Sequence, residues 1–341
     1  TRGSWPLNIY FFRALVLRYF LLRYDVFHYF YDRGILLSNT RFGISVNELE
    51  LLRRAGKRVY TYAYGADVRS QEATLSLGVP NLCQECPSPG QLCICNTEEL
   101  NSSMQRLEGR VTQKIAMGDM LAYVPDHRNM HYWPIDAEKF QEKPLPSLKG
   151  QPFRIAHAPN HPHFKGTRFL QAAVAKLQEE GHDVELIMIQ GVPNERVIEL
   201  FESCHIIADQ FVAGFHGYTA LEAMALGRPV LCFLRGPDMA IDPETCPIIN
   251  ATPDTLYSVL KSCVTSQIDL ELVGISSRAY VERYYTLPAI AAQLGHLYCE
   301  TASFPEHLRS KISDRVSELE ISLERSEFLL SPSQAFKSDR V

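Results

Sequence analysis

The sequence has no excess of positive charge and no secretory signal. Its 34 Lys and Arg are outnumbered by 39 Asp and Glu, so the net charge is -5 and the pI is near 6.1. Nucleic-acid-binding proteins usually carry a strong basic excess, and this balance therefore argues against nucleic acid as a partner. Without a secretory signal we expect a cytoplasmic protein.

The sequence also has no unbroken apolar run long enough to span a bilayer. The stretch from Ile9 to Tyr24 is strongly apolar, but Arg13, Arg18 and Arg23 interrupt it, which excludes an ordinary membrane-spanning helix. Residues 1 to 58 hold ten Lys or Arg against four Asp or Glu, a local charge of +6. Two interpretations stay open: peripheral contact with an anionic membrane surface, and a helix that faces the core of its own domain.

The remaining pattern is that of an α/β protein, and 341 residues suffice for two domains of ordinary size. Segments rich in β-branched and aromatic residues alternate with helical segments, which predicts parallel sheets with ligands at the carboxyl ends of the strands. The expected strands are 25–31, 58–64, 153–157, 184–189, 205–208 and 230–234, and the expected helices are 46–56, 167–180 and 194–203. We predict domains at 1–145 and 151–300 and a charged helical tail at 305–341.

The most informative segment is 214–230, in which a glycine-rich turn runs directly into a helix that ends at Gly227. Glycines let the backbone approach an anion closely, and the amides and dipole of a helix N-terminus favour negative charge. Pro229 then starts the continuous apolar run 230–234, which is typical of a strand buried on both faces. This segment predicts a nucleotide-binding α/β unit.

The same segment resembles the C-terminal signature of retaining, nucleotide-sugar-dependent glycosyltransferases of family four. Those enzymes have two Rossmann-like domains in the GT-B arrangement, and the acidic residue of their E-A-M-A-x-G-x-P-V run, which falls on Glu222, holds the donor's ribose. Met130 to Phe140 resembles the run that closes their first domain. The resemblance covers residues 25 to 300 and implies a GT-B fold with a cleft between the domains. The sequence opens without a glycine-rich first strand and loop, and the resemblance implies that such a unit should precede residue 1, so we expect the first domain to be truncated at its N-terminus.

The resemblance also implies a donor site. Lysine is a good point-charge partner for phosphate, and Lys165 matches the second of the family's two basic residues. The expected nucleotide-sugar-binding residues are Asn160, His161, Lys165, Gly166, Gly191, Gly214, His216, Gly217, Tyr218, Thr219 and Glu222. Lys165, Glu222 and Asp67 are the expected catalytic residues, with Lys165 and the amides near Gly217 stabilising the leaving diphosphate. No Asp-x-Asp metal motif occurs, so we expect no cofactor for catalysis.

The implied function is that of a hexosyltransferase, which moves a sugar with retention from a nucleoside diphosphate sugar to a glycan or lipid-linked acceptor, as in polysaccharide biosynthesis. Three positions depart from the family. Tyr64 stands where a His is common, Asn160 where an Arg is common, and Gly214 where a second Glu is common. These departures leave an alternative, a non-catalytic GT-B module that binds a nucleotide, a glycan or a protein partner. Asp209, just upstream, either replaces a missing polar contact or caps a helix or turn.

Four thiols lie close together in the loop 83–95, at Cys83, Cys86, Cys93 and Cys95. Four closely spaced thiolates suit tetrahedral zinc, and we therefore predict a structural zinc site. Unpaired or redox-active thiols and disulfides are the alternatives.

The tail carries one apolar stripe, because Leu308, Ile312, Val316, Leu319 and Leu323 recur at helical spacings. The stripe indicates either self-association through this helix or packing on the protein's own surface.

Overall fold

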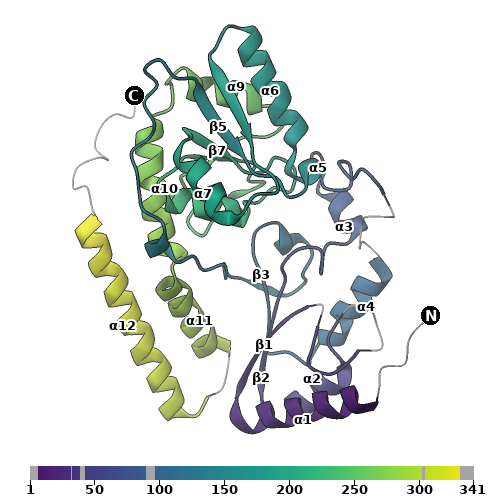
Figure 1. Cartoon of the computed structure of the whole chain (residues 1–341). Coiled ribbons are helices and arrows are strands. Elements are labelled where there is room, and N and C mark those ends of the chain that lie inside the picture. The colour runs from purple at the N-terminus through teal and green to yellow at the C-terminus, as the bar shows by residue number, and fades with distance from the viewer. Residues whose placement is uncertain (1–6, 32, 39–42, 90–96, 302–303, 331–341) are drawn as a thin grey trace.

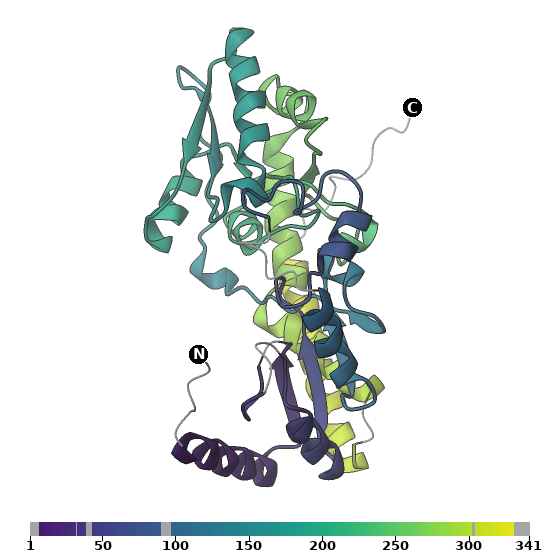
Figure 2. The same ribbon diagram turned by 90° about the vertical axis from the view of Figure 1, so that its right-hand side faces the viewer.

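The computed structural model describes residues 7–31, 33–38, 43–89, 97–301 and 304–330 (Figure 1). Cys93, Cys95 and residues 331–341 of the expected tail lie outside these ranges. The described chain forms two lobes stacked one above the other, each built on a parallel sheet, as the view in Figure 2 shows most clearly. The predicted α/β class is confirmed.

The first sheet has the strand order β1-β2-β3-β4, and all its neighbouring strands are parallel. Its strands are β1 (Val26–Phe30), β2 (Arg58–Tyr62), β3 (Gln113–Ala116) and β4 (His127–Asn129). The helices between them in sequence are α2 (Val46–Arg54), α3 (Gln71–Ser76) and α4 (Thr97–Leu107), and the short helix η1 (Gly118–Ala122) follows β3. The first two predicted strands and the helix between them are confirmed to within two residues at each end.

The second sheet has the order β6-β5-β7-β8-β9, again parallel throughout. Its strands are β5 (Phe153–His157), β6 (Val184–Met188), β7 (Ile206–Ala208), β8 (Val230–Cys232) and β9 (Ile249–Asn250). The helices are α5 (Pro162–Lys165), α6 (Thr167–Glu179), α7 (Asn194–Glu202), α8 (Tyr218–Ala225), α9 (Leu256–Val264) and α10 (Leu270–Tyr284), with η3 (Pro237–Met239) after β8.

Two apolar layers enclose this second sheet. Leu170 and Leu177 of α6 pack with Leu256 of α9 in one cluster, whereas Leu221 of α8 packs with Val281 of α10 in another. Every residue of β7 and β8 is buried, as a strand covered on both faces requires. The apolar run predicted as a strand at 230–234 therefore lies in the middle of the domain.

The chain returns to the first sheet through α11 (Leu287–Thr301). The Tyr298 hydroxyl lies 2.6 Å from Nε2 of His28 on β1, and the Thr301 hydroxyl lies 2.9 Å from that of Tyr60 on β2. The green helices in Figure 1 thus connect the upper lobe to the lower one. The two domains are therefore connected twice, by the linker between β4 and β5 and by this return through α11.

The last helix, α12 (Glu306–Leu330), packs along α11 (Figure 1). Val316, the centre of the predicted apolar stripe, is buried against Gly295 of α11, where an added Cβ would clash with its methyl group. The centre of the stripe therefore packs on the protein's own surface. Self-association through this helix stays a prediction.

The first helix, α1 (Leu7–Arg23), lies beneath the first sheet in Figure 1. Its inner face buries Leu17 and packs Phe20 and Leu21 on the core. Its outer face leaves large apolar side chains exposed, namely Tyr10, Phe11, Phe12, Leu15, Tyr19 and Leu22. Within the described residues, no helix is both long and apolar enough to cross a bilayer. Contact of the outer face with an anionic membrane surface stays a prediction.

Candidate functional site

The expected site lies where two neighbouring strands of the second sheet end. β5 pairs with β7, and His157 at the end of β5 stands opposite Ala208 at the end of β7. The segments that follow them, 158–166 and 209–217, therefore meet at the same edge of the sheet. Gly166 makes this possible with a left-handed backbone (φ 73°), and an added Cβ there would lie 3.1 Å from Cβ of Phe211.

A buried ion pair forms the centre of this edge. The Lys165 ammonium donates to Asp209 Oδ1 at 2.7 Å, and the backbone N–H of Gly217 donates to Asp209 Oδ2. The Asp209 side chain is only 1% exposed and that of Lys165 only 14%. Burial alone would raise the pKa of Asp209, but Lys165 and the Gly217 amide outweigh it and lower the pKa below its ordinary value. Asp209 is therefore an anion at neutral pH.

Helix α8 begins at this ion pair, with Gly217 at its N-cap position. An added Cβ on Gly217 would lie 2.8 Å from the Lys165 ammonium, so the glycine lets the lysine lie directly against the start of the helix. Tyr218 is exposed, and its hydroxyl donates to the Pro134 carbonyl at 2.7 Å. Thr219 is half-buried. The turn and helix predicted from residues 214–227 are thus confirmed.

Glu222 lies one turn into α8 and is half-buried. Asn194, the first residue of α7, donates from Nδ2 to Glu222 Oε1 at 3.0 Å. Burial raises the pKa of Glu222, and the hydrogen bond from Asn194 opposes this shift. Gly191 leads into α7 with φ 67° in open space, so its glycine serves the turn. Sequence reasoning missed Asn194, although it opens a predicted helix at a strand's carboxyl end.

Asn160 and His161, which precede Lys165 in the sequence, also lie at the surface. Asn160 and His161 are exposed in the turn before α5, and the His161 ring lies 6.0 Å from that of Phe164. Both side chains are thus open to solvent, unlike that of Asp209.

Gly214 fills a structural role. It has φ 88°, and an added Cβ would lie 2.9 Å from Cβ of Arg235, which follows β8. The Arg235 guanidinium donates to the carbonyls of Leu77 at 3.1 Å and Pro80 at 2.6 Å in the first domain. The position at which the resembling family has a second Glu is thus packed against an arginine that joins the two domains.

The first domain contributes the loop after β2. Asp67 is buried and accepts from the backbone N–H of Gly65 at 2.7 Å and of Tyr64 at 3.1 Å, so its carboxylate holds its own loop in shape. Tyr64 is 45% exposed and packs edge-on against Phe30. This geometry favours Tyr64 over Asp67 as the side chain that meets a ligand.

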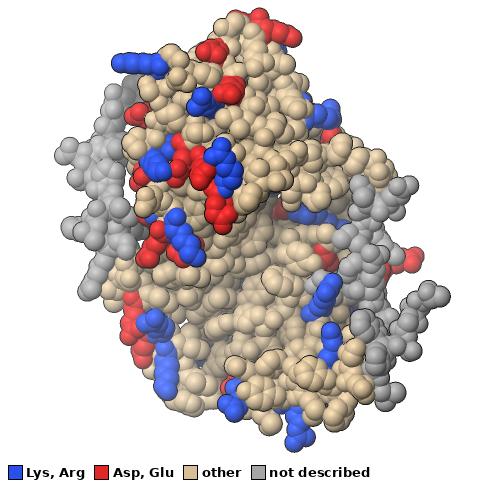
Figure 3. All heavy atoms as spheres, in the orientation of Figure 1, with Lys and Arg blue, Asp and Glu red and all other residues tan. Residues whose placement is uncertain are grey.

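The two domains touch directly at the signature loop, residues 214–217, which precedes α8. Phe215 is buried in the apolar cluster of the first domain, and Gly118 of η1 lies against its ring. Arg168 of α6 forms an ion pair with Glu85 of the first domain at 2.7 Å. On the face drawn in Figure 3 the surface is hollowed where the lobes meet, and acidic and basic side chains are interspersed there without a broad field of one sign.

A buried chain of hydrogen bonds links three side chains at the boundary between the domains. The Tyr285 hydroxyl lies 2.8 Å from Nδ1 of His131 and 3.1 Å from Nε2 of His216. His216 Nδ1 lies 3.2 Å from the Gly217 carbonyl, which can only accept, so Nδ1 carries the proton. Tyr285 therefore donates to His216 and accepts from Nδ1–H of His131. His216 thus connects the start of α8 to Tyr285 through hydrogen bonds. No signal in the sequence identifies these partners.

Because His131 and His216 are buried, we expect the protein to lose stability in acid. Burial lowers the pKa of His131 to about 3 and that of His216 to about 4, from an unfolded value of 6.5. Both rings are therefore neutral in the folded protein, and protonation below pH 6.5 favours the unfolded chain. Each histidine should lower the free energy of unfolding by about 1 kcal/mol per pH unit between pH 6.5 and 5. Urea unfolding across this range should show a shallower pH dependence for His131→Asn than for the unchanged protein, and equal slopes would contradict the assignment.

The structure gives partial information on the cysteine loop. Cys83 and Cys86 lie at the two ends of one turn, in which the Cys86 N–H donates to the Cys83 carbonyl at 3.4 Å, and both are half-buried, whereas Cys93 and Cys95 are outside the described residues. Among the residues that the structure describes, no three His, Cys, Asp or Glu side chains gather as a metal site would need. The structural zinc stays a prediction.

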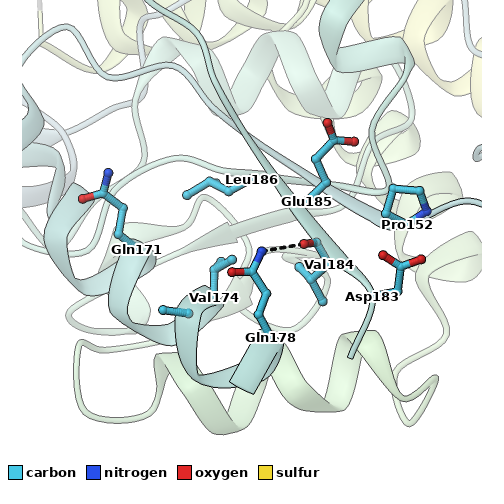
Figure 4. Close-up of a pocket in the computed structure, with 9 residues that line it drawn as sticks. Pro152, Gln171, Val174, Gln178, Asp183, Val184, Glu185 and Leu186 are labelled. Atoms are coloured by element: carbon cyan, nitrogen blue, oxygen red, sulfur yellow. Dashed lines mark hydrogen bonds between the residues drawn. The ribbon is translucent and has the colours of Figure 1, made fainter. Parts of the chain in front are cut away.

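Two surface cavities lie away from this site. One, of about 580 Å³, is an open groove between α6 and the edge strand β6 (Figure 4), where Gln178 donates to the Val184 carbonyl at 2.8 Å. Another, of about 790 Å³, lies between the linker 145–149 and the start of α10. Neither is lined by any expected site residue. The chemistry of the Lys165 region, and not the depth of a groove, marks the candidate site.

No family model matches the sequence, and no curated protein matches it either. Among solved structures, the chain is similar to sucrose-phosphate synthase from Thermosynechococcus elongatus, with 15% identity and a TM-score of 0.57 over 85% of this chain and 77% of that one. It is also similar to Anabaena HepE (Alr3699) in complex with UDP-glucose, with 12% identity and a TM-score of 0.51 over 84% of this chain and 82% of that one.

At these identities the likeness shows the fold. The chain has the GT-B arrangement of two Rossmann-like domains, as the resemblance in its sequence implied.

Proposed function

We propose that this protein is a glycosyltransferase that takes its sugar from a nucleoside diphosphate sugar. The observation that carries the proposal is the convergence of Lys165, the N-terminus of α8 and Glu222 at the carboxyl edge of the second sheet. Ligands of open α/β sheets bind at this edge. One structure of the same fold, that of HepE, holds UDP-glucose.

The proposed reaction is transfer of a hexose with retention, of the family-four type, to a glycan or lipid-linked acceptor. As the bond to the sugar breaks, negative charge develops on the leaving diphosphate. The first amides of α8 and the Lys165 ammonium would stabilise that charge without a metal ion. Glu222, presented by α8 and held by Asn194, would accept hydrogen bonds from the donor's ribose. Tyr64 would face the acceptor from the first domain.

A non-catalytic module that binds a nucleotide or glycan is the second candidate. It is favoured by Asp209, which already neutralises Lys165, and by Asn160, an uncharged residue where the resembling enzymes have an arginine. Such a protein would bind nucleotide without hydrolysing or transferring a sugar. Turnover of UDP-glucose, GDP-mannose and ADP-glucose separates the two candidates.

Glu222→Ala should weaken binding of the preferred nucleotide by about 10- to 100-fold, because hydrogen bonds to a charged group contribute about 1.5 to 3 kcal/mol. Calorimetric titration would measure this change, and Asn194→Ala should produce a smaller loss. Glu179→Ala removes an exposed carboxylate at the far end of α6 and is the matched control. Unchanged affinity in Glu222→Ala would exclude a ribose contact at this residue.

A further inference from the structure

The anion-binding position of the candidate site is already occupied by a side chain of the protein itself. Asp209 accepts from the Lys165 ammonium and from the Gly217 amide at the start of α8. A lysine and a helix N-terminus are the groups that a phosphate would seek. The carboxylate therefore lies where an anionic ligand would form its most favourable interactions.

The surroundings hold Asp209 in this position. The main chain fixes it at the end of the sheet, because its own N–H donates to the Leu231 carbonyl of β8 at 2.9 Å. The absence of a Cβ on Gly217 brings the helix start within reach, since that Cβ would lie 3.1 Å from Asp209 Oδ1. The charges of Lys165 and Asp209 cancel, and the pair has little exposed surface.

We propose that Asp209 is a specificity-determining residue that competes with the donor's diphosphate for Lys165 and for the Gly217 amide at the N-cap of α8. This inference rests on the proposed function and concerns the same site, where Asp209 would limit how much the phosphates contribute to binding. The protein then recognises its ligand mainly through the nucleoside and the sugar, and the two phosphates add little affinity while the ion pair persists. Full use of the lysine requires its ammonium to move from Asp209 to a phosphate oxygen.

The substitution Asp209→Asn tests the proposal, because it keeps the size and an acceptor oxygen but removes the negative charge. Isothermal titration would compare UDP, GDP, ADP and their nucleosides, with inorganic pyrophosphate as a probe that needs no base. In the unchanged protein, the best diphosphate should bind less than tenfold more tightly than its nucleoside. In Asp209→Asn, the diphosphate and pyrophosphate should bind at least tenfold more tightly than before, with nucleoside affinity unchanged. Added salt should diminish the gain.

The control is Asp183→Asn, which makes the same change of charge at an exposed position before β6 and should leave every affinity unchanged. Diphosphate and pyrophosphate binding that is equal or weaker in a folded Asp209→Asn protein would overturn the proposal. A large phosphate contribution in the unchanged protein would overturn it as well, while supporting the donor site. If no nucleotide binds either protein, the proposed function fails, and the pyrophosphate comparison still decides whether Asp209 competes with anions.

Discussion

Lys165→Met should lower the free energy of unfolding by about 3 to 5 kcal/mol, because it leaves the Asp209 carboxylate buried without its cation. The carboxylate keeps only the Gly217 amide as a strong partner, and that is insufficient for a side chain that is 1% exposed. Methionine preserves most of the volume of lysine, so the loss reflects charge and not a cavity. Urea unfolding monitored by circular dichroism would measure it.

The double variant Lys165→Met with Asp209→Asn should recover most of this loss, because it removes both charges together. Lys149→Met, at an exposed position in the linker, should change stability by less than about 0.5 kcal/mol. Additive effects in the double variant would show that the two side chains do not depend on each other, and would contradict the ion pair.

Gly118→Ala should be strongly destabilising and should separate the domains. Gly118 has φ 56°, and an added Cβ would overlap the ring of Phe215, which belongs to the signature loop of the other domain. Because packed interiors have no spare volume, either the ring or the whole domain must move, at a cost of about 3 kcal/mol or more. Since His216 adjoins Phe215, the same displacement should weaken nucleotide binding.

Gly109→Ala provides the control for this prediction. Gly109 has a similar φ of 64°, but an added Cβ there meets nothing within 4 Å, so this variant carries the backbone penalty alone. The difference in unfolding free energy between the two variants isolates the contact with Phe215. Small-angle scattering should show a larger radius of gyration for Gly118→Ala only. Equal stability and equal radii would mean that the domains do not pack at Phe215.

The sequence predicted the fold where local pattern and burial coincide. The apolar run at 230–234 and the glycine-to-helix transition at 217 are each determined by residues close in the chain, and both occur where expected. Contacts between distant segments carry no such pattern. The partnership of Lys165 with Asp209 depends on the pairing of β5 with β7, which lie far apart in sequence. The partnerships of Arg235 with Leu77 and of His131 with Tyr285 depend on how the two domains meet.

Asp209 shows what this difference means for function. From sequence, it was either a replacement polar contact or a cap for a helix or turn, and the structure places its carboxylate on the Gly217 amide at the N-cap of α8. Lys165 was expected as a cation facing a diphosphate. Its ion pair was not foreseeable, because the two residues are 44 positions apart and each is a common surface residue.

Binding of nucleoside diphosphates tests the central claim most directly. Melting temperatures would be measured with increasing UDP, GDP, ADP and their common sugar conjugates, because a ligand that binds only the folded state must raise the melting temperature. A shift with one nucleotide and its sugar conjugate, lost in Glu222→Ala and retained in Glu179→Ala, is the result that the donor site predicts. No shift with any of these nucleotides, at concentrations up to several millimolar, would contradict it.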